Sequence, residues 1–173
     1  MRSCKSRICN SVSRSSVSRC NKELYDQFAA WRRRDLSDMR VMYLFLDGVM
    51  ERVRFGTSEK EGVLVAHAIL EDGSRELLSI HIGPRESEDA WRVVLNDLVA
   101  RGMPQPKLVI SDGCPGLIGA VTKTWRDVPR QRCIAHKIRN VIGRVTKKEQ
   151  PLVKRAVTKI FYAPSLDDAK RAV

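Results

Sequence analysis

A chain of 173 residues with 43% hydrophobic side chains is long enough for one domain with a core of its own. The formal net charge of +12, from 32 Lys and Arg against 20 Asp and Glu, favours a polyanionic partner. No apolar run approaches the roughly 20 residues of a membrane span, and the basic N-terminus lacks the apolar segment of a signal peptide. The five cysteines are odd in number and scattered, which is typical of reduced thiols. We therefore expect a cytoplasmic protein with no membrane partner.

The charge is unevenly distributed along the chain. Residues 1–40 carry ten basic and four acidic side chains, residues 41–112 carry eight and twelve, and residues 113–173 carry fourteen and four. Any one of these runs could be an ordinary solvated surface. Basic segments on both sides of an acid-rich middle nevertheless favour a carboxylate site served by phosphate-binding surfaces.

The N-terminal segment, residues 1–22, is rich in serine and arginine and has the composition of a disordered tail. Within it, Ser13–Arg19 also has the make-up of a short DNA-recognition helix, in which the candidate DNA-binding residues are Arg14 and Arg19. The segment is compatible with both interpretations. Residues 22–38 are predicted to form a linker helix because apolar side chains recur there at helical spacing, namely Leu24, Phe28 and Trp31.

From residue 41 onward the pattern becomes that of β-strands. Apolar runs predict strands over residues 41–50, 62–70 and 76–82. The Asp-Gly pair within Glu71–Ser74 predicts a tight hairpin between the last two of these strands. Short connections of this kind are typical of an antiparallel meander.

A helix is predicted next, over residues 87–101. Ser87 can cap its N-terminus, Gly102 can end it, and an apolar stripe marks its buried face: Trp91, Val94, Leu95, Leu98 and Val99. A fourth strand is expected over residues 107–111. Because the helix is a crossover connection, this strand can lie parallel to the strand at 41–50 and beside it.

Two similar segments, Met42–Gly48 and Lys107–Gly113, each run from apolar strand residues into an aspartate followed by a glycine. In isolation, Asp47 or Asp112 could simply cap a turn, as the aspartate of an Asp-Gly pair often does. Two adjacent parallel strands would instead bring both carboxylates to the same edge of the sheet, where the ion that such a pair usually binds is Mg²⁺. The similarity of the two segments therefore predicts Asp47 and Asp112 as catalytic and metal-binding residues.

The remaining residues predict a helix over 116–125, a strand over 128–133, a helix over 134–142 and a further basic helix over 147–162. The apolar side chains of this last helix are expected to point inward: Leu152, Val153, Ala156, Ile160 and Phe161. The element order up to residue 142 is then β-β-β-α-β-α-β-α, which is the ribonuclease-H-like arrangement. The expected fold class is α/β, with a mixed sheet, a short helical N-terminal extension and a helical C-terminal segment.

Five segments resemble, in order and spacing, the mutator-type transposases of bacterial insertion sequences. They are Tyr43–Gly48, Glu71–Glu76, Glu86–Trp91, Leu108–Gly113 and Gln131–His136. The resemblance implies a ribonuclease-H-like fold, DNA transposition, and a DDE triad that holds two divalent ions, Mg²⁺ or Mn²⁺. It also implies transposon ends as the DNA partner, and a homo-oligomer or the full-length transposase as candidate protein partners.

Carried onto this sequence, the resemblance makes Asp47 the first aspartate of the triad and Asp112 the second. Cys133 and His136 match the Cys-x-x-His motif of the family. The triad glutamate has no counterpart here, because in the family it follows a helical insertion that would lie beyond Val173. We therefore expect little or no strand transfer by this chain alone.

The resemblance also divides the chain into three parts. Residues 1–40 are expected to be the remnant of an N-terminal DNA-binding region with its linker helix. Residues 41–146 are expected to form a partial catalytic core, and residues 147–173 the start of a truncated helical insertion. On this interpretation the chain is a piece of a transposase that is cut at both ends.

Basic residues around the Cys-x-x-His motif are the further candidates for DNA binding: Arg132, His136, Lys137 and Arg139. Cys133 and His136 also raise the alternative of a zinc site, but they supply only half of the four ligands that such a site needs. Two other functions compete with a DDE transposase. One is a catalytically dead DNA-binding or regulatory fragment that lacks the third acidic residue, and the other is a stand-alone ribonuclease-H-like nuclease.

Overall fold

The computed structural model describes residues 13–51, 61–83 and 86–172, and residues 1–12 of the expected DNA-binding remnant lie outside this range. The chain divides into two compact units, Met1–Arg34 and Asp35–Val173. We describe each unit by itself. None of the helices in the described ranges is long and apolar enough to cross a membrane.

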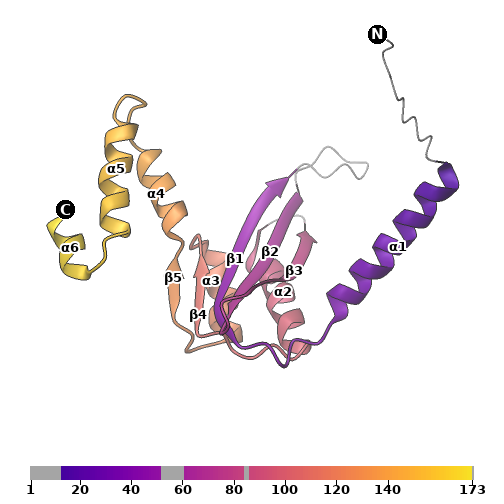
Figure 1. Ribbon diagram of the computed structural model, residues 1–173. Helices are drawn as coiled ribbons and strands as arrows, with labels where there is room; N and C mark the ends of the chain where they lie inside the picture. Colours follow the sequence, from indigo (N-terminus) through magenta and orange to yellow (C-terminus); the bar gives the residue numbers. More distant parts are fainter. Residues whose placement is uncertain (1–12, 52–60, 84–85, 173) are drawn as a thin grey trace, which may run out of the picture. The chain divides into compact units, whose positions relative to one another are not determined.

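The first unit contains one helix, α1, which spans Arg14–Arg33 (Figure 1). It begins earlier than predicted, because Ser13 caps it by accepting a hydrogen bond from the Ser16 backbone N–H at 3.1 Å. The segment with recognition-helix composition and the predicted linker helix are thus one continuous helix. No residue of α1 is buried.

The second unit is built on a sheet of five strands in the order β3-β2-β1-β4-β5 (Figure 1). β1 pairs with β2 and β2 with β3 in antiparallel fashion, whereas β4 lies parallel to β1 and β5 parallel to β4. The prediction that the fourth strand lies beside the first is therefore confirmed. The strands span Val41–Glu51 (β1), Glu61–Leu70 (β2), Arg75–Gly83 (β3), Leu108–Ser111 (β4) and Arg130–Arg132 (β5).

The hairpin between β2 and β3 forms at the predicted Asp-Gly pair. Gly73 has a φ of 83°, a left-handed conformation that glycine adopts without strain. The Asp72 carboxylate reinforces the turn by accepting a hydrogen bond from the Ser74 backbone N–H at 2.8 Å. This turn fixes the register of the two strands.

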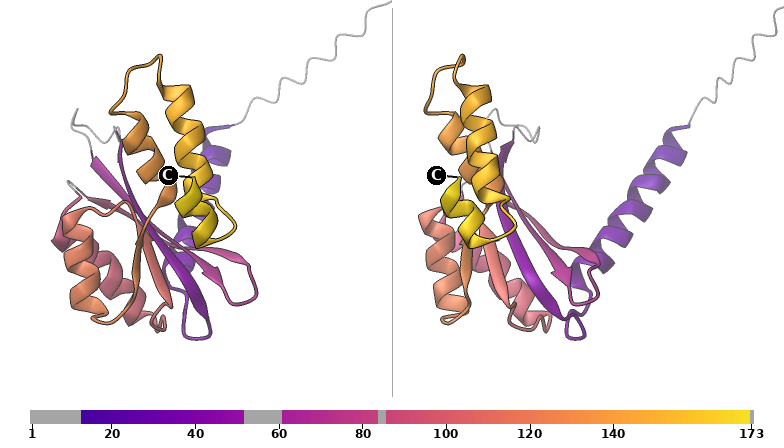
Figure 2. Two further views of the ribbon diagram at one scale, coloured as in Figure 1. Left: turned by 90° about the vertical axis from the view of Figure 1, so that its left-hand side faces the viewer. Right: turned by 60° about the vertical axis from the view of Figure 1, so that its left-hand side comes forward.

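Two helices, α2 (Glu88–Ala100) and α3 (Pro115–Thr124), pack against each other and cover one face of the sheet (Figure 2). Ser87 caps α2 as predicted, because its Oγ accepts from the Ala90 N–H at 3.2 Å. Gly102 follows the helix with a φ of 84°. Four of the five residues of the predicted stripe are buried, but Val99 is 45% exposed and does not belong to it.

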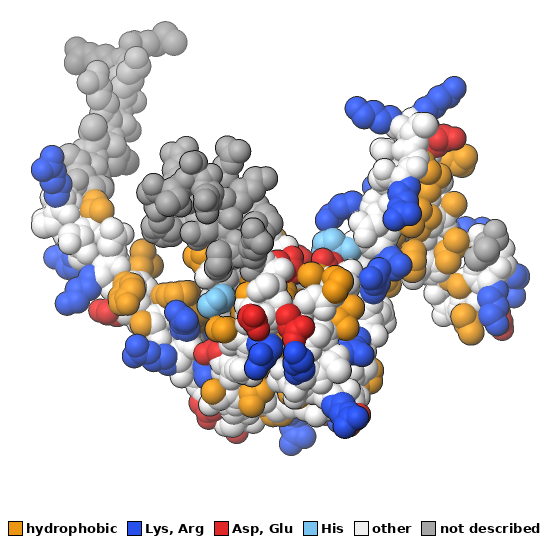
Figure 3. Space-filling view, turned by 180° about the vertical axis from the view of Figure 1, so that it is seen from behind, with side chains coloured by type: hydrophobic (Ala, Val, Ile, Leu, Met, Phe, Trp, Pro, Cys, Tyr) orange, Lys and Arg blue, Asp and Glu red, His pale blue; other side chains and the backbone are white. Residues whose placement is uncertain are grey.

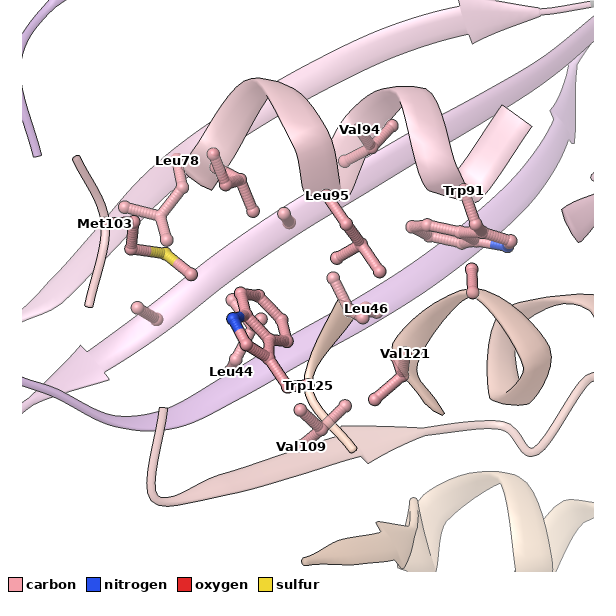
Figure 4. Close-up of a cluster of buried hydrophobic side chains, with 14 of the residues drawn as sticks. Leu44, Leu46, Leu78, Trp91, Val94, Leu95, Met103, Val109, Val121 and Trp125 are labelled. Carbon is pink, nitrogen blue, oxygen red and sulfur yellow. The ribbon is translucent and has the colours of Figure 1, made fainter. Parts of the chain in front are cut away.

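The core lies between this helical layer and the sheet (Figure 4). Leu44 and Leu46 of β1 point into it, together with Trp91 and Leu95 of α2, and each of these side chains is at most 2% exposed. Burial of one such side chain stabilises the fold by about 1.5–3 kcal/mol. Because strand residues alternate between faces, the residues between Leu44 and Leu46 and after Leu46 point to the opposite face of the sheet.

The C-terminal helices are α4 (Ile134–Ile142), α5 (Gln150–Phe161) and α6 (Leu166–Arg171), and none of their residues is buried. α5 begins later than the predicted helix over 147–162. Its apolar side chains were expected to point inward, yet Leu152 is 65% and Phe161 40% exposed. β5 is likewise shorter than predicted, and all three of its residues are exposed.

Candidate active site

The two predicted aspartates lie at matching positions on neighbouring parallel strands. The register of β1 and β4 pairs Leu46 with Ser111. Asp47 directly follows Leu46, and Asp112 directly follows Ser111. Adjacent strands are separated by about 4.8 Å, and residues in matching positions point to the same face. The alternation that buries Leu46 therefore directs the Asp47 carboxylate away from the helical layer formed by α2 and α3, whereas Asp112 is the first residue after β4.

Asp47 is the only one of the two that lies within a strand, since β1 continues to Glu51. Its side chain is 47% exposed, so the carboxylate avoids the cost of complete burial. The Nε2 atom of His136 lies 3.9 Å from its Oδ1 atom. This distance is too long for a hydrogen bond but within the range of an ion pair when the imidazole is protonated.

Asp112 begins a tight turn directly after β4. Its Oδ1 atom accepts a hydrogen bond from the Cys114 backbone N–H at 2.9 Å. Gly113 has a φ of 86°, and a Cβ atom at this position would collide with the guanidinium group of Arg132. Arg132 also donates from Nη2 to the Gly113 carbonyl at 3.3 Å. The turn thus fixes the direction of the Asp112 carboxylate and binds one of the predicted DNA-contacting arginines.

A third carboxylate, that of Glu86, lies beside β1 at Gly48, the residue that follows Asp47. Its oxygens occupy the space beside Gly48, where a Cβ atom would come within 2.9 Å of both. Its Oε1 atom accepts a hydrogen bond from the indole N–H of Trp91 at 3.1 Å. Burial raises the pKa of Glu86 above its usual value, the hydrogen bond from Trp91 opposes this change, and the charges of Asp112 and Asp47 add to it.

No sequence pattern selected Glu86 as a site residue. It belongs to the segment Glu86–Trp91, which carried part of the family resemblance, but no role was predicted for it. The signal that could have identified it is the spacing from Glu86 to Trp91, since a buried indole N–H needs an acceptor. Its approach to Gly48 depends on how the segment before α2 packs on the sheet, which no local pattern reveals.

The predicted Cys-x-x-His motif lies at the end of β5 and in the first turn of α4. The Cys133 backbone N–H donates to the Ser111 carbonyl at 2.6 Å, which ties the motif to the end of β4 beside Asp112. His136 is the motif residue that reaches Asp47. Its Nδ1 atom is buried and has no hydrogen-bond partner among the described residues.

The predicted DNA-binding residues fall into two groups. Arg132, His136, Lys137 and Arg139 lie together on β5 and α4, where Arg139 is exposed and Lys137 partly exposed. Arg14 and Arg19 are exposed on α1, in the other unit. Lys and Arg side chains project from the C-terminal helices, on the right of Figure 3.

A second histidine lies on the same face of the sheet as Asp47. His67 of β2 pairs with Phe45 of β1, and the two rings stack with their centroids 4.6 Å apart. Burial lowers the pKa of His67, the nearby charge of Arg75 lowers it further, and the charge of Asp47 acts in the opposite direction. The neutral imidazole is therefore the favoured form.

Comparison with known proteins places this arrangement in a family. A model of the family "Transposase, Mutator family" matches residues 2–173. The chain belongs to the Mutator family of transposases.

Several relatives in this family are transposases of insertion sequences. The chain is 36% identical to the IS6120 transposase of Mycolicibacterium smegmatis, over 94% of this chain and 50% of the relative. It is 34% identical to the IS256 transposase of Tn4001 from Staphylococcus aureus, over 94% of this chain and 42% of the relative. It thus spans about half, or less, of the length of these relatives. Among solved structures, the Drosophila P element transposase strand transfer complex aligns with 12% identity over 73% of this chain and 40% of that chain, and the TM-score of 0.38 is too low to establish a shared fold.

The donor set of this Mutator-family chain suits one hard divalent cation. Mg²⁺ is commonly held by one or two carboxylates, with water and substrate phosphate completing its shell, and Asp47 and Asp112 can supply that pair. Within the described ranges, no three His, Cys, Asp or Glu side chains lie close enough together to hold a metal ion. The zinc alternative for Cys133 and His136 therefore gains no further ligand from these residues.

Proposed function

We propose that this chain functions in DNA transposition and contributes the two aspartates of a DDE-type active site. The observation that carries the proposal is the register of β1 and β4, which brings Asp47 and Asp112 to adjacent positions at one edge of the sheet. The strand order, with three antiparallel strands and a fourth parallel to the first, supports a ribonuclease-H-like core for residues 41–146.

In this proposal Asp47 and Asp112 hold Mg²⁺ or Mn²⁺, which when bound supplies the Lewis acidity that phosphoryl transfer requires. The turn at Gly113 keeps the Asp112 carboxylate in a fixed direction through the Cys114 N–H. His136 lies between the aspartates and the basic start of α4, where its imidazole can contact Asp47 or a DNA phosphate. These residues bind and orient the substrate strand at the carboxylates.

The proposed DNA contacts come from two places in the chain. Lys137 and Arg139 of α4 lie close in sequence to His136, so they would contact phosphates next to the active site. Arg14 and Arg19 would act within a DNA-binding segment that belongs to residues 1–40. The proposed partners are transposon ends as the DNA, and a homo-oligomer or the full-length transposase as the protein.

Thermal unfolding with and without Mn²⁺ tests the proposed active site. A cation that binds the native state raises the unfolding temperature by mass action, so wild-type protein should melt at a higher temperature in millimolar Mn²⁺. The variants Asp47→Asn and Asp112→Asn should lose this shift while remaining folded. A wild-type protein whose melting temperature does not respond to Mn²⁺ would contradict the proposal, and so would an unchanged shift in both variants.

A further inference from the structure

Among the carboxylates that the structure describes outside the proposed aspartate pair, that of Glu86 has a distinctive position. It follows β3 and immediately precedes the cap of α2, yet its side chain turns back onto the β1 backbone at Gly48, the residue after Asp47. Any side chain at Gly48 would occupy the space of the Glu86 carboxylate. With glycine here, the carboxylate can lie against the β1 backbone beside the residue that follows Asp47.

The carboxylate of Glu86 is held from the core side rather than from the surface. Its hydrogen-bond donor, Trp91, is a residue with 0% exposure whose ring packs between α2 and the sheet (Figure 4). The indole cannot turn toward solvent without opening the core, so the acceptor oxygen has a fixed position. A side chain anchored in this way loses little further rotational entropy when a ligand binds nearby.

The relation of Glu86 to the aspartates is electrostatic rather than coordinative. Asp112 and Asp47 both act on its charge through space. The three carboxylates nevertheless do not converge closely enough to form a three-residue metal cluster in the described part of the chain. Because these three side chains do not form one ligand group, a cation held by the two aspartates would interact with Glu86 through its bound water.

We propose that Glu86 is a positioning residue for the divalent cation of the Asp47–Asp112 site, and that it accepts hydrogen bonds from cation-bound water. Mg²⁺ and Mn²⁺ keep water in their shells when only one or two carboxylates bind them directly. A fixed outer acceptor orients that water and adds a third negative charge near the cation. Residues that contact the ligands of a metal rather than the metal itself typically change metal affinity by roughly 10- to 100-fold.

A Mn²⁺ titration of the variant Glu86→Gln tests this inference, which rests on the proposed aspartate site. Binding is followed by loss of the electron paramagnetic resonance signal of free Mn²⁺, a readout that does not depend on catalysis. The glutamine retains an oxygen for the Trp91 N–H but removes the charge. We expect its affinity for Mn²⁺ to fall by about tenfold or more.

The matched control is Glu88→Gln, the same change two positions along the chain. Glu88 forms an ion pair with Lys123 that joins α2 to α3, so its charge already has a partner and this variant should bind Mn²⁺ as the wild type does. Equal affinity in Glu86→Gln and wild type would overturn the inference while leaving the aspartate site intact. Complete loss of binding in Glu86→Gln would identify a direct ligand and overturn it too. Absence of binding by the wild type would contradict the aspartate site itself, and with it the role of Glu86.

Discussion

The absence of a side chain at Gly48 decides where the Glu86 carboxylate lies. In the variant Gly48→Ala the new methyl group would displace that carboxylate and leave the buried Trp91 N–H without its acceptor. Loss of such a hydrogen bond destabilises a protein by about 1–3 kcal/mol, which chemical denaturation can measure. Gly83→Ala is the control, since a Cβ there meets only ordinary contacts at 3.8 Å. A Gly48→Ala protein as stable as this control would show that the carboxylate moves aside without cost.

His67 predicts a dependence of stability on pH. Because its pKa is lowered in the folded protein, the unfolded chain takes up a proton first as the pH falls below about 6.5. The free energy of unfolding contributed by the neutral imidazole is therefore fully present above that pH and decreases as the pH falls toward the folded-state pKa. His67→Gln should show a smaller decrease between about pH 7.5 and pH 5.5 in urea unfolding. Parallel curves for the variant and the wild type would contradict the assignment.

The helix α2 shows both what sequence periodicity predicts and where it stops. Its cap at Ser87, its end at Gly102 and four members of its stripe were predicted correctly, because each depends on local chemistry. The predicted burial of Val99 was wrong, because a position next to the stripe is buried or exposed depending on what packs there. The prediction that the apolar side chains of α5 point inward was wrong for the same reason, because none of them is buried in the described part of the chain.

A pair of valine truncations on α2 tests this assignment of its faces. Val94 is 1% exposed, so Val94→Ala should destabilise the protein by roughly 2 kcal/mol through lost burial and the cavity it leaves. Val99→Ala removes the same atoms from a side chain that is 45% exposed and should change stability by less than about 0.5 kcal/mol. Denaturant midpoints decide the point, and equal losses in the two variants would contradict the packing.

At the scale of the whole molecule, the sheet topology was predicted from two strand–aspartate–glycine segments and the crossover helix between them. That argument located Asp47 and Asp112, because the parallel register of β1 and β4 brings matching positions of the two segments side by side. It could not locate Glu86, whose carboxylate reaches Gly48 of β1 through the tertiary packing of the segment before α2. It also could not show that Ser13–Arg19 would join the next segment in a single helix, since the composition fitted a tail equally well.

The charge of the whole chain predicts DNA binding that depends strongly on salt. With a net charge of +12 and fourteen basic residues after residue 112, affinity for duplex DNA should fall by at least about tenfold between about 50 and 200 mM salt, as counterions are released. In the double variant Lys137→Gln/Arg139→Gln the slope of log affinity against log salt should decrease by about two. Arg92→Gln is the control, because Arg92 lies on α2 beside Asp89. An affinity for DNA that does not change with salt would contradict this prediction and show that the basic residues form only a solvated surface.

The central claim is that Asp47 and Asp112 together hold one divalent cation. Crystals of the wild-type chain soaked in Mn²⁺ test it most directly, since the anomalous signal of manganese locates the ion without reference to activity. The account predicts an anomalous peak about 2–2.5 Å from carboxylate oxygens of both Asp47 and Asp112, and no peak at this place in Asp112→Asn crystals. A wild-type map without a peak between these two carboxylates, or with manganese bound only elsewhere on the chain, would contradict it.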